Sequence, residues 1–424
     1  SFDADYVKYD SGNDQVFKNF NFNNQDELFY EDRINGDIPS TIEIYAAKTD
    51  YSKPIGEKSR FEAGLKTAFT KTDNEAIYTQ TIDNVTKPDY NLSNRFLYDE
   101  WINAAYVNYN TSIGKLEIQA GLRAESTKLT GEQLGNVERE GSRFTRTYNS
   151  LFPTFYASVP LDSAGIHSMN FSYGRRIDRP YFQDLNPFIS PLDQFTFYSG
   201  NPNLLPTFSH NLSLSHSYKG FLNTTLSYSK TTDGINETLE IVDGIYYSRP
   251  GNIGSSTSLT LSVSANMDAN KWYSINMYTE TARLAYKSQL YTERLNSSGI
   301  YYFLSVNNSF QLGKTWKASF GGRYISDVVA AQLVIKSYFV TNLGFQKKIL
   351  DGKGNLRLAV DDIFYTRRGN GIINNLRLTD ADWNSKYDSQ RVTLTFSYNF
   401  GKPTSNKQKY NSSGSDSEQQ RVRG

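Results

Sequence analysis

The sequence predicts an all-β protein that folds as an antiparallel transmembrane β-barrel. Three observations lead to this prediction. Apolar and polar residues alternate in many segments, these segments are about ten residues long, and short and long links alternate between them. Hydrophobic residues make up only 38% of the 424 residues, and mean hydropathy is −0.58. A barrel keeps this average low because lipid-facing and lumen-facing residues alternate along each strand.

The alternation defines the individual strands. It is clearest in RVTLTFSYNF near the C-terminus, where Val392, Leu394 and Phe396 oppose Thr393 and Thr395. A period of two is the strand period. In chain order, the same division recurs in 116–125, 168–174, 211–218, 222–229 and 258–267.

Sixteen strands are expected in all. Their predicted spans are 2–9, 41–52, 59–72, 96–110, 115–128, 149–160, 166–176, 207–218, 221–232, 255–268, 272–286, 300–312, 316–326, 334–348, 355–366 and 389–400. A tilted strand needs about ten residues to cross a membrane, whereas strands of soluble sandwiches are more often about five or six residues long. Strand length therefore favours the barrel over a soluble all-β protein.

The links between these strands fall into two classes. Short links occur at 53–58, 111–114, 161–165, 219–220, 269–271, 313–315 and 349–354. Longer polar links alternate with them at 10–39, 73–95, 129–148, 177–206, 233–254, 287–299, 327–333 and 367–388. Short turns at one end and long loops at the other are typical of outer-membrane barrels, with the long loops extracellular.

The two faces of the last predicted strand would contact different surroundings. Its apolar face would touch lipid, and its Thr393 and Thr395 face would look into the lumen. Backbone groups in hydrocarbon must all be paired, so such a sheet has to close on itself. We therefore expect residues 1–400 to form the barrel and residues 401–424, which are rich in Lys, Ser, Asn and Gln, to be a disordered periplasmic tail.

Composition excludes several other classes. The 45 basic and 44 acidic residues give a net charge of +1, whereas a nucleic-acid binder carries a basic surplus. The absence of cysteine excludes disulfides and thiolate metal sites. There is no apolar run long enough for a transmembrane helix. The chain opens with SFDADYVKYD and not with a signal peptide, so we expect its start to be a cut within a longer protein.

Four stretches suggest a family. They are FLYDEWINAAYVNYNTSIGKLEIQAGLRAEST (96–127), SYGRRIDRPYFQDLNPF (172–188) followed by GNPNLLPTFSHNLSLSHSY (200–218), GNLRLAVDDIFYTRRG (354–369), and the terminal strand (389–400). In this order and spacing the sequence resembles the C-terminal part of a TonB-dependent outer-membrane transporter of the kind common in Bacteroidetes. The family barrel has 22 strands, so the sixteen expected here would be its final ones. Whether they close alone or complete a larger ring is left open by the sequence.

The resemblance implies a location and a function. It implies an outer-membrane receptor of a Gram-negative bacterium whose extracellular loops capture a scarce nutrient such as an iron chelate, a glycan or a peptide. Import would depend on TonB acting through an N-terminal plug, and a surface lipoprotein is a possible partner alongside outer-membrane lipid. Two alternatives stay open: a non-transporting barrel that scaffolds a surface complex, and a soluble all-β binding protein.

Candidate ligand-binding residues lie in and near the long link 177–206. Arginines suit an anionic ligand, and aromatic rings suit stacking; the candidates are Arg176, Arg179, Tyr181, Phe182, Phe197 and Tyr198. In a structural role, the arginines would instead pair with carboxylates such as Asp178 or Asp184, and the rings would pack within the loop. Arg123 and Glu125 share one strand face two residues apart, and we interpret them as part of a lumen charge network that would face a plug.

Catalysis finds little support in the sequence. The three histidines, His167, His210 and His216, show no metal-ligand spacing. Asp361 and Asp362 are adjacent in a predicted strand, so they point to opposite faces and cannot share one site. Nucleophile-elbow, P-loop and dinucleotide-binding motifs are absent from the sequence. We therefore expect no enzyme activity, no cofactor and no metal site.

Overall fold

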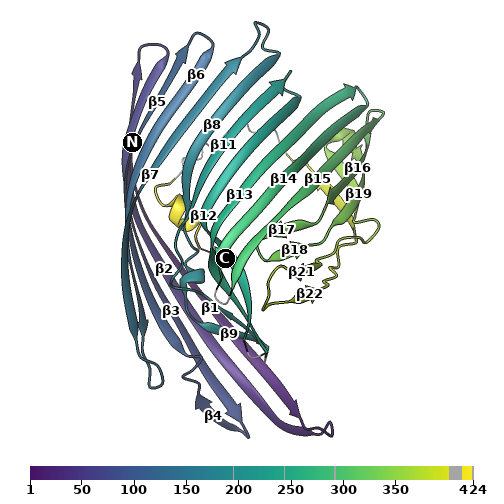
Figure 1. Ribbon diagram of the computed structural model, residues 1–424. Helices are drawn as coiled ribbons and strands as arrows, with labels where there is room; N and C mark the ends of the chain where they lie inside the picture. The colour runs from purple at the N-terminus through teal and green to yellow at the C-terminus, as the bar shows by residue number, and fades with distance from the viewer. Residues whose placement is uncertain (194, 243, 291–292, 401–412, 423–424) are drawn as a thin grey trace.

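The computed structural model describes the chain except residues 194, 243, 291–292, 401–412 and 423–424. One large sheet of nineteen strands curves around a common interior, and four short strands form a second sheet (Figure 1). The predicted all-β, antiparallel fold is confirmed. None of the helices among the described residues is long and apolar enough to cross a membrane.

Sixteen long strands, here called the wall strands, follow one another in chain order, and each pairs antiparallel with the next. They are β1 (Phe2–Phe22), β2 (Leu28–Ile55), β3 (Ser59–Ile82), β5 (Asn94–Ile113), β6 (Leu116–Leu134), β7 (Ser142–Pro160), β8 (His167–Asp178), β11 (Thr207–Tyr218), β12 (Leu222–Val242), β13 (Ile245–Asn270), β14 (Tyr273–Gln289), β15 (Arg294–Leu312), β16 (Trp316–Ile325), β19 (Tyr338–Ile349), β20 (Gly354–Asp361) and β23 (Arg391–Tyr398). Each predicted span overlaps one of them.

Shorter elements lie in the links. The strands β4 (Val85–Pro88), β9 (Ile189–Asp193) and β10 (Thr196–Ser199) join the large sheet. The second sheet consists of β17 (Val328–Ala330), β18 (Leu333–Ile335), β21 (Gly371–Ile373) and β22 (Ala381–Trp383). The helical elements are η1 (Gln183–Leu185), η2 (Leu350–Gly352) and α1 (Asp416–Gln419). The sequence did not predict these short elements.

The two ends of the sheet differ, as the links predict. Turns at the short end reverse the chain within a few residues and use glycine at positive φ, as at Gly114 (φ 62°) between β5 and β6. The expected link 10–39, however, is mostly strand, because β1 and β2 stay paired as far as Phe22 and Leu28. Beyond the bilayer both strand faces can be polar, so the alternation fades while the backbone ladder continues. The sequence pattern therefore underestimated these strands.

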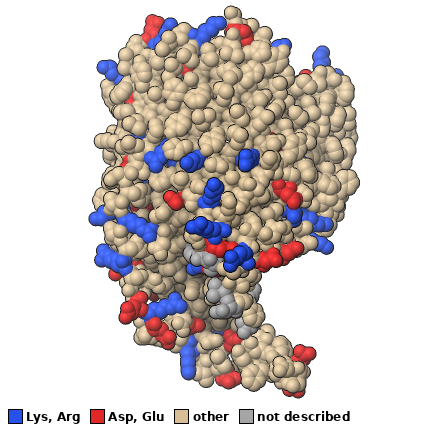
Figure 2. Space-filling model, viewed as in Figure 1, with Lys and Arg blue, Asp and Glu red and all other residues tan. Residues whose placement is uncertain are grey.

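The outer face of the sheet carries an aromatic row. Tyr6, Tyr45, Phe69 and Trp101 lie on neighbouring strands β1, β2, β3 and β5, with successive ring centroids 4.9, 6.3 and 5.4 Å apart. Aromatic girdles of this kind mark the lipid–water boundary of outer-membrane barrels. Figure 2 shows a broad band with few charged side chains between the short-turn rim at the top and the charged region below it. This band is where lipid is expected to contact the wall.

The inner face places glycines beneath aromatic rings. Gly64 pairs with Tyr106 across β3 and β5, and a Cβ on Gly64 would lie 2.6 Å from the Tyr106 ring. Gly36 and Tyr78 form the same arrangement across β2 and β3. A ring lying over a glycine restores the packing that the missing side chain would provide. These glycines therefore let large side chains lie flat against the wall.

The sheet has two edges among the described strands. β1 pairs only with β2, and β23 pairs only with β20. In β23, residues on both faces are exposed, including Leu394 at 68%. The outermost backbone N–H and C=O groups of β1 and β23 therefore have no strand partner in the part of the chain that the structure describes.

The C-terminal segment differs from the expected disordered tail. Residues 413–422 form a turn and the short helix α1 on the inner face of the sheet, where Glu418 and Arg421 make ion pairs with wall strands. The sequence pattern missed this because the segment has few apolar residues and is held by charges. Residues 401–412 and 423–424, which the disorder prediction also covers, lie outside the described residues.

Asp362 organises the turn that follows β20. Its carboxylate accepts hydrogen bonds from the amides of Thr366 (2.9 Å) and Arg367 (3.0 Å) and from the hydroxyl of Ser389 (2.6 Å), and the residue is 1% exposed. Burial raises the pKa of the Asp362 carboxyl, but the hydrogen bonds from Ser389 and the two amides outweigh this effect. The net result is a pKa below that of an ordinary aspartate.

The substitution Asp362→Asn should lower the free energy of unfolding by about 1.5–3 kcal/mol at neutral pH, the range for hydrogen bonds to a charged group. Because the folded-state pKa is depressed, this stabilisation is fully present above the unfolded pKa of about 3.9 and is lost as pH falls through the folded-state pKa. Urea unfolding of both proteins across this pH range measures the difference.

Asp361→Asn is the matched control for this experiment. The Asp361 carboxylate lies 3.5 Å from the exposed guanidinium of Arg391, so its loss should change stability by less than about 1 kcal/mol. The neighbouring carboxylates have separate partners, but both line one cavity of about 480 Å³, so the prediction that they cannot share a site is wrong. The alternation of the strand ends at Asp362, whose φ is 46°. Equal losses at both positions, or a pH-independent difference at Asp362, would contradict the role assigned to Asp362.

Candidate functional site

The long link between β8 and β11 folds back onto the inner face of the sheet. Four of its side chains, Phe182, Leu185, Phe188 and Leu204, are buried in one hydrophobic cluster with residues of β2, β3, β5 and β6. Gly200 makes this path possible, since a Cβ there would lie only 2.1 Å from the carbonyl oxygen of Asn186. The Gly-Asn-Pro motif therefore has the structural role of letting two backbone segments approach closely.

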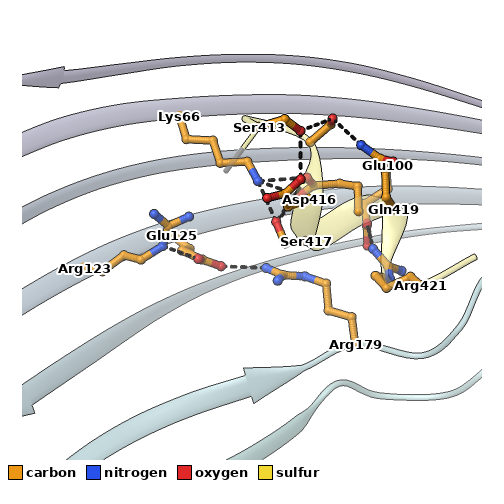
Figure 3. Close-up of polar contacts among 12 residues, drawn as sticks. Lys66, Glu100, Arg123, Glu125, Arg179, Ser413, Asp416, Ser417, Gln419 and Arg421 are labelled. Atoms are coloured by element: carbon orange, nitrogen blue, oxygen red, sulfur yellow. Dashed lines mark hydrogen bonds and ion pairs between the residues drawn. The ribbon is translucent and has the colours of Figure 1, made fainter. Parts of the chain in front are cut away.

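Arg179, at the start of this link, makes an ion pair with a wall strand. Its guanidinium lies 2.6 Å from Glu125 and donates a hydrogen bond to Thr127 (3.1 Å). Arg123 contacts the other oxygen of Glu125 at 2.5 Å. Glu125 is 9% exposed, whereas Leu122, on the opposite face of the same strand, is 45% exposed. Arg123, Glu125 and Arg179 thus form one charge network on the inner face (Figure 3).

The other predicted ligand residues occupy different environments. Phe182 is only 2% exposed. Of the two roles considered from the sequence, ligand stacking and packing, its position matches packing. Phe197 lies on β10, and its ring stacks on Tyr247 at 5.8 Å. Arg176 and Tyr181 are exposed. Tyr198 lies beside Phe197 on β10 and is partly buried.

A cavity brings three of these candidates together. It has a volume of about 210 Å³ and lies between the link and the strands β12 and β13. Its lining includes Arg179, Tyr181, Asp184, Tyr198 and Glu237. Asp178 lines it as well, so one guanidinium, three carboxylates and two phenol rings surround the space, which suits a ligand that carries both charge and flat apolar surface. Arg176 does not line this cavity.

The strand register gives the neighbours of the predicted lumen-facing residues of the last strand. Thr395 stands opposite Arg357 of β20, and Thr393 stands opposite Ala359. Leu394 stands opposite Leu358 on the other face. That apolar face continues to Phe345 of β19. The register thus separates the two sets of side chains as the alternation does.

Two side chains of the inner face were not singled out from the sequence. Glu100 of β5 is 2% exposed and makes an ion pair with Arg421, and Lys66 of β3 makes one with Glu418 at 2.8 Å. A signal existed for Glu100, because it shares its strand face with Phe96, Tyr98 and Ile102. A lone carboxylate on an apolar face requires a partner.

The described residues form no metal centre around the histidines. His167 Nδ1 lies 3.0 Å from His216 Nε2 at the short-turn end of β8 and β11, and their rings stack. Within the described ranges, no group of three or more His, Cys, Asp or Glu side chains is arranged to hold a metal ion.

The comparisons with known proteins decide the family. A model of the outer membrane protein beta-barrel family matches residues 1–398. The chain belongs to this family. It is therefore a protein of the outer membrane, as the resemblance implied. A search of the curated proteins finds no match.

Several solved structures share the fold of this outer-membrane barrel. The ferric yersiniabactin uptake receptor FyuA from Yersinia pestis has 13% identity and a TM-score of 0.58, over 94% of this chain and 59% of the receptor. The siderophore receptor PiuA from Acinetobacter baumannii has 11% identity and a TM-score of 0.58, over 94% and 62%. The copper transporter OprC has 11% identity and a TM-score of 0.58, over 93% and 64%. The chain spans less than two thirds of the length of each.

Proposed function

We propose that this barrel is a receptor that captures a nutrient with its long loops and imports it across the outer membrane in a TonB-dependent manner. The observation that carries the proposal is the cavity at the long link between β8 and β11, lined by Arg179, Tyr181, Tyr198 and three carboxylates. Its volume of about 210 Å³ suits one charged or aromatic group of a larger ligand, such as an iron chelate or a peptide. The fold that the chain shares with FyuA and PiuA, which are named as receptors, supports the same function.

The barrel of this receptor would contain further strands. The outer edges of β1 and β23 present backbone N–H and C=O groups without a strand partner among the described residues. In hydrocarbon such groups must be paired, so we propose that additional strands join the two edges to complete a larger ring. A plug coupled to TonB would occupy its interior and supply the energy for import.

A growth assay tests this function. The host is grown on a panel of ferric chelates, glycans and peptides, each supplied as the sole source of iron, carbon or nitrogen. Deletion of the barrel gene should abolish growth on one panel member, and deletion of tonB should abolish the same growth. The double substitution Tyr181→Ala with Tyr198→Ala should reduce uptake of that nutrient at limiting concentration at least tenfold. Val137→Ala, in another exposed loop at the long-loop end, should leave uptake unchanged.

The alternative, a scaffold for a surface complex, gives a different outcome. The barrel deletion would then release a surface protein from the cells without affecting growth on any panel member. That result would overturn the proposal of transport.

A further inference from the structure

We propose that the inner face carries a guanidinium-binding site, formed by Glu100, Phe182 and the carbonyl of Pro180, that holds the chain's own C-terminal segment. The segment is residues 413–422, here called the docked segment, and it enters the site through Arg421. Docking places these residues inside the curve of the sheet (Figure 1), and Figure 3 shows their polar contacts. The proposal is independent of what, if anything, the barrel transports.

The site contacts Arg421 in three chemically distinct ways. Its Nη1 donates to a carboxylate oxygen of Glu100, its Nε donates to the Pro180 carbonyl at 2.9 Å, and its guanidinium carbon lies 4.1 Å from the centre of the Phe182 ring. A planar guanidinium satisfies a carboxylate, a carbonyl and a ring face together, which the ammonium of lysine does less well. The arrangement is therefore selective for arginine.

Both members of the ion pair are buried in the docked state. Glu100 is 2% exposed and Arg421 is 7% exposed. The hydroxyl of Tyr98 donates to the second oxygen of Glu100 at 2.9 Å, which orients the carboxylate. Arg421 is the cation paired with Glu100 among the described residues. A buried carboxylate without a cation is strongly unfavourable, so Glu100 favours the docked state.

A second ion pair of opposite polarity fixes the orientation of the docked segment. Lys66 Nζ lies 2.8 Å from a carboxylate oxygen of Glu418 and donates to Ser417 Oγ at 2.6 Å. Its partner Glu418 precedes Arg421 by three residues. If the segment docked in the reverse direction, Glu418 would approach Glu100, and like charges would repel. The two pairs together therefore specify both position and direction.

Docking has a consequence for the interior of the barrel. The docked segment covers the inner face of β3 and β5, next to the Arg123–Glu125–Arg179 network. Anything else that enters this space, whether a ligand or another domain, must displace Arg421 from Glu100 or supply a guanidinium of its own. The C-terminal segment thus acts as a competitor for the interior.

Hydrogen–deuterium exchange of the full chain in detergent micelles tests the docking. The amides of residues 413–422 should exchange at least tenfold faster in Arg421→Gln and in Glu100→Gln than in the unaltered chain. Arg421→Lys should also accelerate exchange, since lysine cannot make the three contacts. Glu132→Gln, which removes a carboxylate 3.9 Å from Arg143 on the same wall, is the matched control and should change nothing.

A binding experiment separates docking from a folding defect. In Arg421→Gln the wall strands are unaltered, so heat-modifiable gel mobility should be retained and the site should be vacant. A fluorescent peptide SGSDSEQQRV, which copies residues 413–422, should then bind this variant, whereas the peptide with Gln in place of Arg should not. Equal exchange in the unaltered chain and in Arg421→Gln, or equal binding of the two peptides, would overturn the proposal.

Discussion

The substitution Leu394→Arg should destabilise the membrane-inserted barrel by about 2–4 kcal/mol, the cost of a lipid-facing arginine near the bilayer midplane. Leu394 is 68% exposed on the outer face, opposite Leu358 of β20 and in line with Phe345 of β19. The side chains next to Leu394 on that face, Val392, Phe396 and Leu358, are all apolar and cannot receive a guanidinium. Urea titration of the protein folded into lipid vesicles, followed by heat-modifiable gel mobility, measures the loss.

The neighbouring positions provide the controls. Thr393→Arg places the same charge on the inner face opposite Ala359 and should have a much smaller effect. Thr395→Arg should also cost far less than Leu394→Arg, although it faces Arg357 and cross-strand repulsion adds up to about 1 kcal/mol. Equal losses at positions 393, 394 and 395 would mean that the two faces of β23 do not meet lipid and lumen as assigned.

The substitution Glu125→Leu should lower the free energy of unfolding by about 3–5 kcal/mol, because it leaves a buried cation without its partner. The side chain of Arg179 is 12% exposed and lies 2.6 Å from Glu125, so little water can replace the lost carboxylate. The double variant Glu125→Leu with Arg179→Met should recover part of the loss, since it removes both charges. Urea unfolding of the single and double variants gives the coupling energy between them.

Glu132→Leu is the control on the same strand. Glu132 lies 3.9 Å from Arg143, and both side chains are well exposed, so its removal should cost less than about 1 kcal/mol. If the Glu125 and Glu132 variants lost similar amounts of stability, the inner network would be an ordinary surface pair and not a buried one.

Much of the wall could be predicted from the sequence because lipid imposes a strict pattern. A strand such as β23 must place Val392, Leu394 and Phe396 on one face, and this alternation persists wherever one face meets hydrocarbon. The pattern fails where that constraint ends. Residues 11–22 of β1 remain paired with β2, yet 11–15 are all polar or glycine, and Lys18 interrupts the apolar positions Val16, Phe20 and Phe22.

The candidate site was less accessible to sequence reasoning because its contacts join distant residues. Arg179 was expected to pair with a carboxylate, but its partner Glu125 lies 54 residues earlier, on another strand. Arg421 and Glu100 are 321 residues apart. Alternation can place Glu125 on the inner face, but it carries no information on which side chain of a long link folds back to meet it.

The paired extension of β1 and β2 forms an arm that reaches far beyond the aromatic row. Beyond the girdle residue Tyr6, the hairpin continues to Phe22, roughly 50 Å when measured along the strand at about 3.3 Å per residue. Its tip at 23–27 is therefore presented well away from the headgroups (Figure 1). A large particle that approaches the molecule from this end would reach the hairpin arm before it reached the aromatic row.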